Sequence, residues 1–405
     1  MSSPAALDPR RARLALWGLA GAAFTDALGA TMILPILPLF LRHGGASYTE
    51  VGLTTAAFWG AGLVVGYPVG RLSDRLGRRR LLVGSELLYA AATAAFALTP
   101  SPIGFILLRA VQGAASGSAN VLALSLVADI VIPERRGRAY GLLTGANMAG
   151  TIAGPMIGAV LFSISVALTF LVSAAAAVLV SGIILATVPA GKLARSHARE
   201  PSQPRAIWRQ RGLLGILLSS MAVGVLIGMY DTLWSLLMHS RHASNFEIGL
   251  SFTIFALPFT VGSWPAGWLA DHLDNRRLIR AGMVFAGAFA ATYPFVPSPV
   301  WLIALGAFEG IFTVVGMPAR QAMLSRLVPA EQMGRAQGMY SSFQVGASAL
   351  AAIGAGALFG VGAPLPFVGT AVVMVGTALV LMPLWRGVDG HPRPAREAER
   401  AAVSA

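Results

Sequence analysis

Cysteine is absent from this chain of 405 residues, and charged residues make up only 12% of it. The lack of cysteine excludes disulfide bonds and thiol chemistry, although it leaves the cellular compartment open. The low charge content, together with 56% apolar residues, leaves too little polar surface to cover a water-soluble protein. We therefore expect most of the chain to lie in a lipid bilayer.

The motifs of enzymes and ATP-driven pumps are missing as well. The sequence has no glycine-rich phosphate loop, no histidine or cysteine cluster at metal-ligand spacing and no nucleophile elbow. We therefore expect no enzymatic activity, no cofactor and no metal site. An ion gradient remains as the energy source for any work that the protein does.

Long apolar runs recur along the chain between short loops. Each is close to the roughly 20 residues that cross a hydrocarbon core about 30 Å thick. The sequence thus predicts an all-α membrane protein with twelve transmembrane helices. The predicted spans are 14–41, 49–70, 81–98, 102–132, 139–163, 165–189, 212–240, 246–269, 278–295, 299–327, 335–359 and 364–385.

The net charge of +13 is distributed over alternate loops instead of one stripe, which argues against a nucleic-acid partner. The loops of the other side carry only Arg42 and Arg241 as basic residues. By the positive-inside rule, both termini and the central loop lie in the cytoplasm. Because the first apolar run is too long for a cleavable signal and contains Asp26, we expect a multi-pass protein of the inner (plasma) membrane. The basic segments are 10–13, 71–80, 135–138, 192–211 and 276–280.

The chain contains an internal duplication. The segment 70–80 reads GRLSDRLGRRR, and the related segment 267–277 begins 197 positions later. This repeat predicts two pseudo-symmetric six-helix bundles. We assign them to residues 1–189 and 212–386, joined by a hydrophilic cytoplasmic linker at 190–211 and followed by a disordered cytoplasmic tail at 387–405. The same offset pairs Glu50 with Glu247, Gly52 with Gly249, Phe58 with Phe255, Pro68 with Pro265 and Gly113 with Gly310.

Three motifs relate the chain to a known family. The loop motif G-x-L-a-D-r-x-G-r-r is matched at Gly70, Leu72, Asp74, Arg75, Gly77, Arg78 and Arg79. The motif R-x-x-q-G is matched at 109–113. The motif G-x-x-x-G-P-x-x-G-G is matched at Gly150, Gly154, Pro155 and Gly158, with Ala159 in place of the last glycine. With these residues the chain resembles the major facilitator superfamily, and within it the drug:proton antiporters that include tetracycline and multidrug exporters.

The resemblance implies the major facilitator fold and a transport function. In this family the third motif marks exporters, so it implies proton-coupled efflux of small molecules. The implied partners are a small-molecule substrate, protons and the lipid bilayer, and the implied state is a monomer.

The loop motif places the acid Asp74 in a strongly basic loop. By analogy with the family, Asp74 would lie against the other half, and Arg78 and Asp129 would complete a charge network that holds the halves closed inside. Gly70, Arg75 and Gly77 belong to the same latch. The alternative is that these arginines only satisfy the positive-inside rule. In the second copy Asp271 repeats the acid, but Asp274 and Asn275 replace a glycine and a basic residue.

Arg109 is predicted to lie about 10 Å deep in the fourth span. An arginine at the centre of a membrane helix costs about 2.5 to 3.5 kcal/mol, so we expect it to face a wet cavity or a carboxylate. Gln112, Ser116 and Asn120 share its helical stripe. A part in proton coupling and a purely structural role that ties helices together are both open.

Asp26, near the middle of the first span, is the leading candidate for the proton carrier, and Asp231 and Glu309 are the other deep acids. A carboxyl group in an apolar interior can stay neutral when dry and ionise when water or a cationic substrate reaches it. Glu86, near the cytoplasmic end of the third span, is a weaker candidate. The alternative for each is a buried acid whose hydrogen bonds are satisfied.

The glycines of the third motif recur every four residues, so they form one smooth helical face for close packing, and Pro155 permits a bend. Ordinary packing of small residues is the alternative to an antiporter motif. Aromatic and amide side chains near the expected cavity are candidate substrate contacts. They are Phe24, Gln112, Asn120, Asn147, Tyr230, Trp234, Phe343 and Gln344.

The function predicted from these observations is export of a small amphipathic molecule in exchange for protons by alternating access. The interior is predicted to hold three deep acids but only two deep arginines, Arg109 and Arg320. This mildly acidic balance favours cationic or zwitterionic substrates. One alternative is a proton-coupled uptake symporter for a sugar or organic acid. Another is a non-transporting membrane sensor, which would need a soluble domain or long loops that we do not expect here.

Overall fold

The computed structural model describes residues 9–99, 101–131, 135–189, 210–329 and 332–390. These residues form helices joined by short turns, and the described part contains no β-strand. The predicted linker at 190–211 lies outside the described residues except for Gln210 and Arg211. The tail beyond residue 390 lies outside them too.

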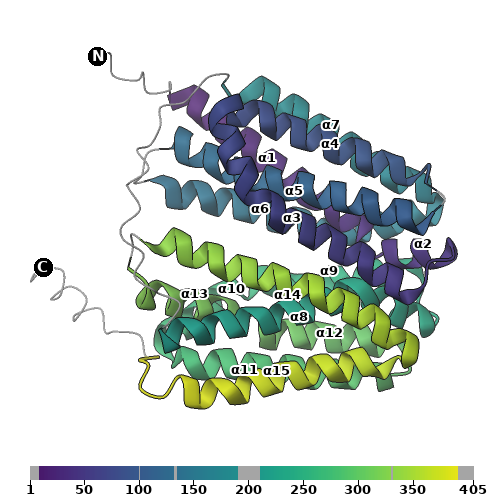
Figure 1. Cartoon of the computed structure of the whole chain (residues 1–405), viewed down its shortest axis with the longest axis vertical. Coiled ribbons are helices and arrows are strands. Elements are labelled where there is room, and N and C mark those ends of the chain that lie inside the picture. The colour runs from purple at the N-terminus through teal and green to yellow at the C-terminus, as the bar shows by residue number, and fades with distance from the viewer. Residues whose placement is uncertain (1–8, 100, 132–134, 190–209, 330–331, 391–405) are drawn as a thin grey trace, which may run out of the picture.

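The helices divide into two halves of the chain, drawn in the upper and lower parts of Figure 1. The first half contains α1 (Pro9–Ile33), α2 (Leu37–His43), α3 (Tyr48–Leu76), α4 (Arg78–Phe96), α5 (Pro102–Ile130), α6 (Arg136–Ile164) and α7 (Val166–Thr187). The second half contains α8 (Arg211–Ser240), α9 (Asn245–Val261), α10 (Ser263–His272), α11 (Asn275–Thr292), the short 3₁₀ helix η3 (Tyr293–Phe295), α12 (Pro299–Thr313), α13 (Gly316–Leu327), α14 (Met333–Val361) and α15 (Pro364–Leu384).

Ten spans in the described part are long and apolar enough to cross a membrane, and eleven if the bent pair α9 and α10 counts as one. The remaining long helix, α4, carries Arg79, Arg80 and Glu86, which make it more polar than the others. The all-α membrane architecture is confirmed. The twelfth span, which α4 would form, stays a prediction.

Three of the predicted spans are interrupted. The helix axis bends by 47° between α9 and α10, where Pro258 lies one turn before the break at Gly262. The break between α12 and α13 precedes Pro318, which has no N–H to donate to the carbonyl of Val314. Pro35 lies between α1 and α2 in the same way. The apolar runs alone could not reveal these breaks, because the residues around each break remain apolar.

The duplication is visible in how the helices pack. A Cβ atom on Gly113 of α5 would overlap the carbonyl oxygen of Phe58 on α3, and a Cβ on Gly310 of α12 would lie 2.9 Å from the carbonyl oxygen of Phe255 on α9. Both pairs belong to the offset of 197 positions. The two halves therefore use the same glycine-to-backbone contact at equivalent places.

The repeat pair Glu50 and Glu247 has a structural role. Each glutamate closes a capping box at the start of a helix, α3 and α9 respectively. The backbone N–H of Ser47 donates to Glu50 at 2.6 Å, and that of Ser244 donates to Glu247 at 2.7 Å. These boxes satisfy N–H groups that the first turn of a helix leaves unpaired.

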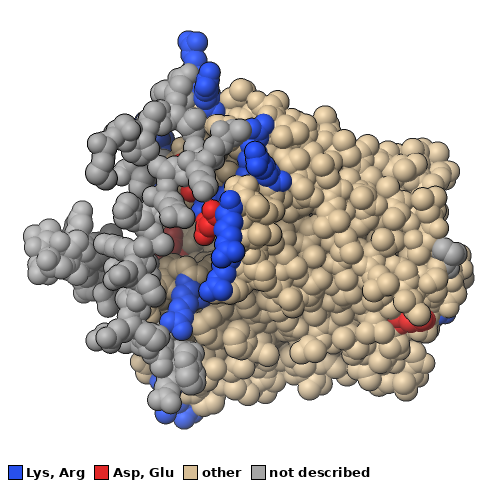
Figure 2. All heavy atoms as spheres, turned by 45° about the horizontal axis from the view of Figure 1, so that its top comes forward, with Lys and Arg blue, Asp and Glu red and all other residues tan. Residues whose placement is uncertain are grey.

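Basic side chains gather at one end of the bundle, which we call the basic end. Figure 2 shows them as a band there, next to a long flank without charged residues. The first turns of α1, α4 and α8 contribute Arg10, Arg78 and Arg211 to this end. The basic loops therefore lie at the same end of the bundle, and the cytoplasmic location of this end stays a prediction from the loop charges.

The halves meet closely at the end opposite the basic end, where α3 packs on α14 and α6 packs on α9. A Cβ on Gly356 of α14 would overlap the carbonyl of Tyr48, and a Cβ on Gly52 would overlap that of Ala352. Towards the basic end, side chains of α3 and α10 are exposed instead of packed between the halves. Tyr67 is 69% exposed and Trp264 is 82% exposed. The structure is therefore closed between the halves at the end away from the basic loops.

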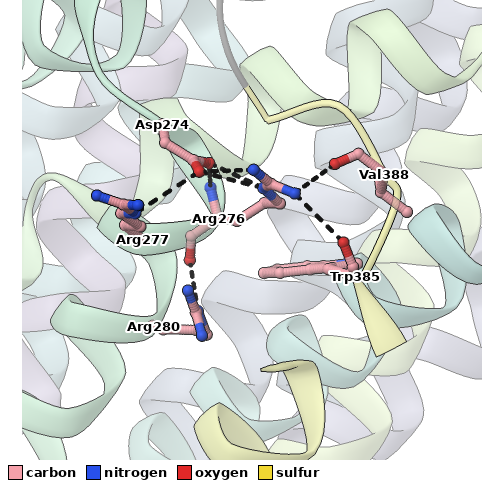
Figure 3. A network of polar contacts seen from close by, with 6 residues as sticks. All are labelled: Asp274, Arg276, Arg277, Arg280, Trp385 and Val388. Carbon is pink, nitrogen blue, oxygen red and sulfur yellow. Dashed lines mark hydrogen bonds and ion pairs between the residues drawn. The ribbon is translucent and has the colours of Figure 1, made fainter. Parts of the chain in front are cut away.

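The first residues of the predicted disordered tail lie in the described part, where Figure 3 shows Val388 bonded to Arg276 of α11. Arg276 donates to the carbonyls of Val388 at 2.6 Å and Trp385 at 3.3 Å. The backbone N–H of Asn275 donates to the carbonyl of Gly390 at 2.9 Å. The prediction of disorder is therefore wrong for residues 387–390.

Asp274, which replaces the motif glycine in the second copy, caps α11. Its carboxylate accepts from the backbone N–H of Arg276 at 2.9 Å and forms an ion pair with the guanidinium at 2.8 Å. The Asp274 side chain is 5% exposed. Arg276 thus joins the helix cap to the segment that follows α15.

Gly356→Leu should open the contact between the halves, because the added side chain has no space against Tyr48. A clash of about 1 kcal/mol already shifts a two-state equilibrium about fivefold. The chain has no native cysteine, so cross-linking of a His43→Cys/His239→Cys pair reports the contact without background; these rings lie 6.2 Å apart across the halves. Gly354→Leu is the control, because nothing lies within 4 Å of its Cβ position. Equal cross-linking in both variants would contradict the assignment.

Arg276→Ala should lower the free energy of unfolding by about 1–3 kcal/mol, since a buried carboxylate and two carbonyls lose their donor. Thermal melting of the purified protein measures this loss. Arg277→Ala is the matched control, because Arg277 is 80% exposed and lies 3.9 Å from the same carboxylate. We expect its effect to stay below about 0.5 kcal/mol, and a similar loss in both variants would refute the role of Arg276.

Candidate functional site

A polar contact joins the two halves deep in the bundle. Trp59 on α3 donates its indole N–H to the carboxylate of Asp231 on α8 at 3.2 Å. Both side chains are partly buried. Since α3 belongs to the first half and α8 to the second, Asp231 is an acid at the interface of the two halves.

Arg109 supplies the opposite charge from the first half. It is 4% exposed, and its guanidinium lies 4.2 Å from the ring centroid of Phe58, the neighbour of Trp59. Its charge and that of Asp231 attract each other. The Nε atom of Arg109 has no hydrogen-bond partner. The structure therefore places a deep arginine opposite a carboxylate of the other half.

Gln112 holds Arg109 in position. Its side-chain oxygen accepts from Arg109 at 2.9 Å, and its amide nitrogen donates to Thr93 at 2.7 Å. Gln112 is completely buried, whereas Asn120, two turns along the same predicted stripe, is exposed. Gln112 is thus enclosed in this conformation, and its side chain is not accessible to a substrate. Its contact with substrate stays a prediction.

Glu309 on α12 lies in a cage of aromatic residues. It is 1% exposed, and its carboxylate accepts from Tyr230 at 3.0 Å and from Tyr293 at 2.6 Å. The Trp234 ring packs edge-on against both tyrosines, at centroid distances of 5.7 Å and 4.8 Å. The structure therefore brings the predicted residues Glu309, Tyr230 and Trp234 together.

Tyr293 was not among the predicted site residues. It lies in η3 after α11, outside any helical stripe that could relate it to Glu309. Its only sequence signal is a tyrosine at the end of an apolar span, where aromatic residues are common for other reasons. Trp59 was missed for a similar reason, because it stands in an apolar run.

The other predicted substrate contacts are spread over α1, α6 and α14. Phe24, Asn147 and Gln344 are partly buried, and Phe343 is 43% exposed. The helices that carry them pack closely, since Cβ atoms on Gly150 and Gly224 would overlap the carbonyls of Phe24 and Gln344. Asp26, on α1, has one buried carboxylate oxygen without a hydrogen-bond partner.

The glycine motif of α6 makes two sets of contacts. Cβ atoms on Gly150, Gly154 and Gly158 would all overlap atoms of α1. On the other side, the carbonyl of Pro155 faces Gly249 of α9, in the second half. The motif therefore fixes α6 against its own half and lets it approach the other half closely.

The predicted latch residues cluster at the basic end. Arg78 forms an ion pair with Asp129 at 2.7 Å and a longer one with Asp74 at 3.7 Å. All three belong to the first half, and the Asp74 side chain is 61% exposed. The contact between Asp74 and the other half therefore stays a prediction for another conformation.

The backbone conformation of this loop explains why the loop motif has a glycine at position 77. Gly77 has φ +92°, a conformation that side chains disfavour, and it separates α3 from α4. Gly70 has open space around it, and Arg75 is exposed. An open pocket of about 530 Å³ lies beside the loop and is lined by Pro68, Arg71, Leu72, Asp74 and Arg75.

Comparison with known proteins relates the chain to drug-resistance transporters. It is 30% identical over 350 residues to the class C tetracycline resistance protein of Escherichia coli, covering 80% of this chain and 84% of the relative. It is 22% identical over 368 residues to the quinolone resistance protein NorA of Staphylococcus aureus, covering 89% and 94%.

The fold has relatives among solved structures. The crystal structure of the nucleoside transporter NupG superimposes with a TM-score of 0.79 at 13% identity, covering 92% of this chain and all of that chain. The family model of the Major Facilitator Superfamily matches residues 19–233 and again 213–405. The two-half helical bundle, the loop motif and these matches agree, and the chain is a transporter that belongs to the Major Facilitator Superfamily.

Proposed function

We propose that this transporter exports small amphipathic, drug-like molecules in exchange for protons, with both termini in the cytoplasm and one chain as the working unit. The contact of Asp231 with Trp59 is the observation that carries the proposal. It places a titratable group where the two halves meet, and relative movement of the halves is how transporters of this architecture expose a midplane site to alternate sides.

The chemistry of exchange follows from the single negative charge of Asp231. A carboxylate can be neutralised by a proton or by the cationic group of a substrate, but not by both at once. Each ligand therefore displaces the other, which is the condition for antiport. Either ligand also weakens the attraction between Asp231 and Arg109, so binding is communicated to the contact between the halves.

Glu309 is proposed as a second acid of the same pathway, with Tyr230 and Tyr293 as its hydrogen-bond donors. The aromatic faces around it suit a flat or cationic substrate through stacking and cation–π attraction. Phe24, Asn147, Phe343 and Gln344 remain the proposed contacts from other helices.

The direction of transport is supported by two observations. The relatives described above are resistance proteins for tetracycline and quinolone, as their names state. The glycine and proline residues of α6 match the motif that marks exporters. The latch of Asp74, Arg78 and Asp129 is proposed to close the basic end in the alternate conformation.

Asp231→Asn should abolish substrate-driven proton movement, because asparagine cannot exchange a proton. The measurement uses everted vesicles containing the full chain, with tetracycline, a fluoroquinolone and lipophilic cations as substrates. Glu50→Gln is the matched control, since glutamine preserves the capping box of α3 while removing an acid outside the bundle. Proton movement that survives in Asp231→Asn would contradict the role of Asp231. If substrate and protons move in the same direction, the protein is an uptake symporter and the proposed export is refuted.

Trp59→Phe should weaken the contact between the halves while keeping an aromatic ring. A hydrogen bond to a charged group contributes about 1.5–3 kcal/mol, so we expect both slower transport and reduced cross-linking of the His43→Cys/His239→Cys pair. Trp301→Phe, at a side chain that is 65% exposed on α12, is the control. Unchanged cross-linking in Trp59→Phe would show that the indole N–H does not join the halves.

A further inference from the structure

Two histidines meet across the halves at the end opposite the basic end, and the proposed exchange at Asp231 uses neither. His43 is the last residue of α2, and His239 lies in the last turn of α8, a helix that packs on α2. Their ring centroids lie 6.2 Å apart, and the ring planes are inclined at 70°. Both side chains are exposed, so an ion in the surrounding water can reach them.

The separation of the rings fits two ligands of one metal ion. A Zn²⁺ ion lies about 2.0–2.1 Å from an imidazole nitrogen that binds it. Two imidazoles on the same ion therefore have ring centroids about 5 Å apart at a tetrahedral angle and about 6.5 Å apart on opposite sides of the ion. The 6.2 Å between His43 and His239 lies within this range. The helices thus already hold the rings at a separation that one ion requires, and only exposed side chains have to turn.

The hydrogen bond of His43 determines which ring nitrogen is available. Its Nδ1 atom lies 2.8 Å from the carbonyl oxygen of Leu39, one turn earlier in the chain. Since a carbonyl oxygen only accepts, Nδ1 carries the proton and Nε2 of the neutral ring keeps its lone pair. Histidines that bind metals are commonly oriented by such a bond from the other ring nitrogen. His43 is therefore oriented to bind an ion through Nε2.

The charged groups near the pair have partners of their own. Arg42 and Arg241 each donate to a backbone carbonyl. Glu50 and Glu247 accept in the capping boxes of α3 and α9. His239 stands at the carbonyl end of α8, where the helix dipole favours a bound cation. Among the described residues, no third histidine or carboxylate joins the two rings in a metal-binding group, so water has to supply the remaining ligands of the ion.

We propose that His43 and His239 form a binding site for one divalent transition-metal ion, such as Zn²⁺ or Ni²⁺, between the two halves. Imidazole nitrogen is a preferred ligand of these ions. Because the two ligands belong to different halves, the bound ion stabilises the conformation in which this end is closed, and it slows any transport that requires this end to open. The effect on transport rests on the proposed alternating movement, whereas binding of the ion does not.

Isothermal titration calorimetry of the full-length protein, purified without a histidine tag, measures Ni²⁺ binding. His43→Ala and His239→Ala should each weaken binding at least about tenfold, because each removes one of only two protein ligands. His272→Ala is the matched control. Its Nδ1 atom also lies 2.8 Å from the carbonyl oxygen one turn earlier, but its ring is stacked on Trp268 instead of lying beside another histidine.

The stoichiometry shows whether one ion joins the two rings. We expect that His43→Ala/His239→Ala binds Ni²⁺ no more weakly than either single variant, since the loss of one ligand already destroys a shared site. If each single variant keeps half of the bound Ni²⁺, the histidines bind separately and the inference is overturned. Equal binding in His43→Ala, His272→Ala and the unmodified chain would place the ion elsewhere and would also overturn it.

The effect on transport is measured with Zn²⁺ on both sides of the vesicle membrane. Zn²⁺ should slow substrate-driven proton movement at least about fivefold, which corresponds to roughly 1 kcal/mol in favour of the closed conformation, and a chelator should restore the rate. His272→Ala should remain sensitive, whereas His43→Ala and His239→Ala should not. Inhibition that survives in the latter two variants, or binding without inhibition, would refute the claim that the ion holds this end closed.

The binding measurement needs no substrate and no transport, so it is independent of the exchange assay. Ni²⁺ binding that requires both histidines, in a protein without exchange, would support the site and refute the proposed function. Exchange without such binding would do the reverse.

Discussion

The cost of a charge inside an apolar bundle governs the arrangement of this transporter. Each deep charged group has to find a partner within the protein, because lipid offers none. Glu309 is surrounded by tyrosine hydroxyls, and Arg109 is held by Gln112 and the face of Phe58. Asp231 takes its partner from the other half. The need of the Asp231 carboxylate for a partner thereby links the two halves, which have to move relative to each other.

Glycine is the second determinant, since it sets how closely the helices approach. The contacts of Gly113 with Phe58 and of Gly310 with Phe255 place backbone against backbone in each half. The same kind of contact at Gly52 and Gly356 joins the halves at one end. Close approach inside each half makes it a rigid unit, whereas close approach between the halves can be made and broken as they move.

The sequence was sufficient to predict most of the architecture, because apolar runs, loop charges and a duplication are properties of the chain itself. It could not place the break before Pro318, because the residues around it remain apolar, nor the ordered residues 387–390, which depend on a partner distant in sequence. The deep acids could be predicted from their cost alone. Trp59 and Tyr293 could not, because an aromatic residue in a membrane span has many ordinary roles.

The two capping boxes have a geometric consequence. Ser47 with Glu50 and Ser244 with Glu247 fix the first turns of α3 and α9, the helices that pack against the opposite half at equivalent places in the duplication. Both helices thus start from anchored points on the same face of the protein. Because Tyr48, the first residue of α3, also contacts Gly356 of α14, the capping box keeps the shape of this surface while the contact between the halves is made and broken.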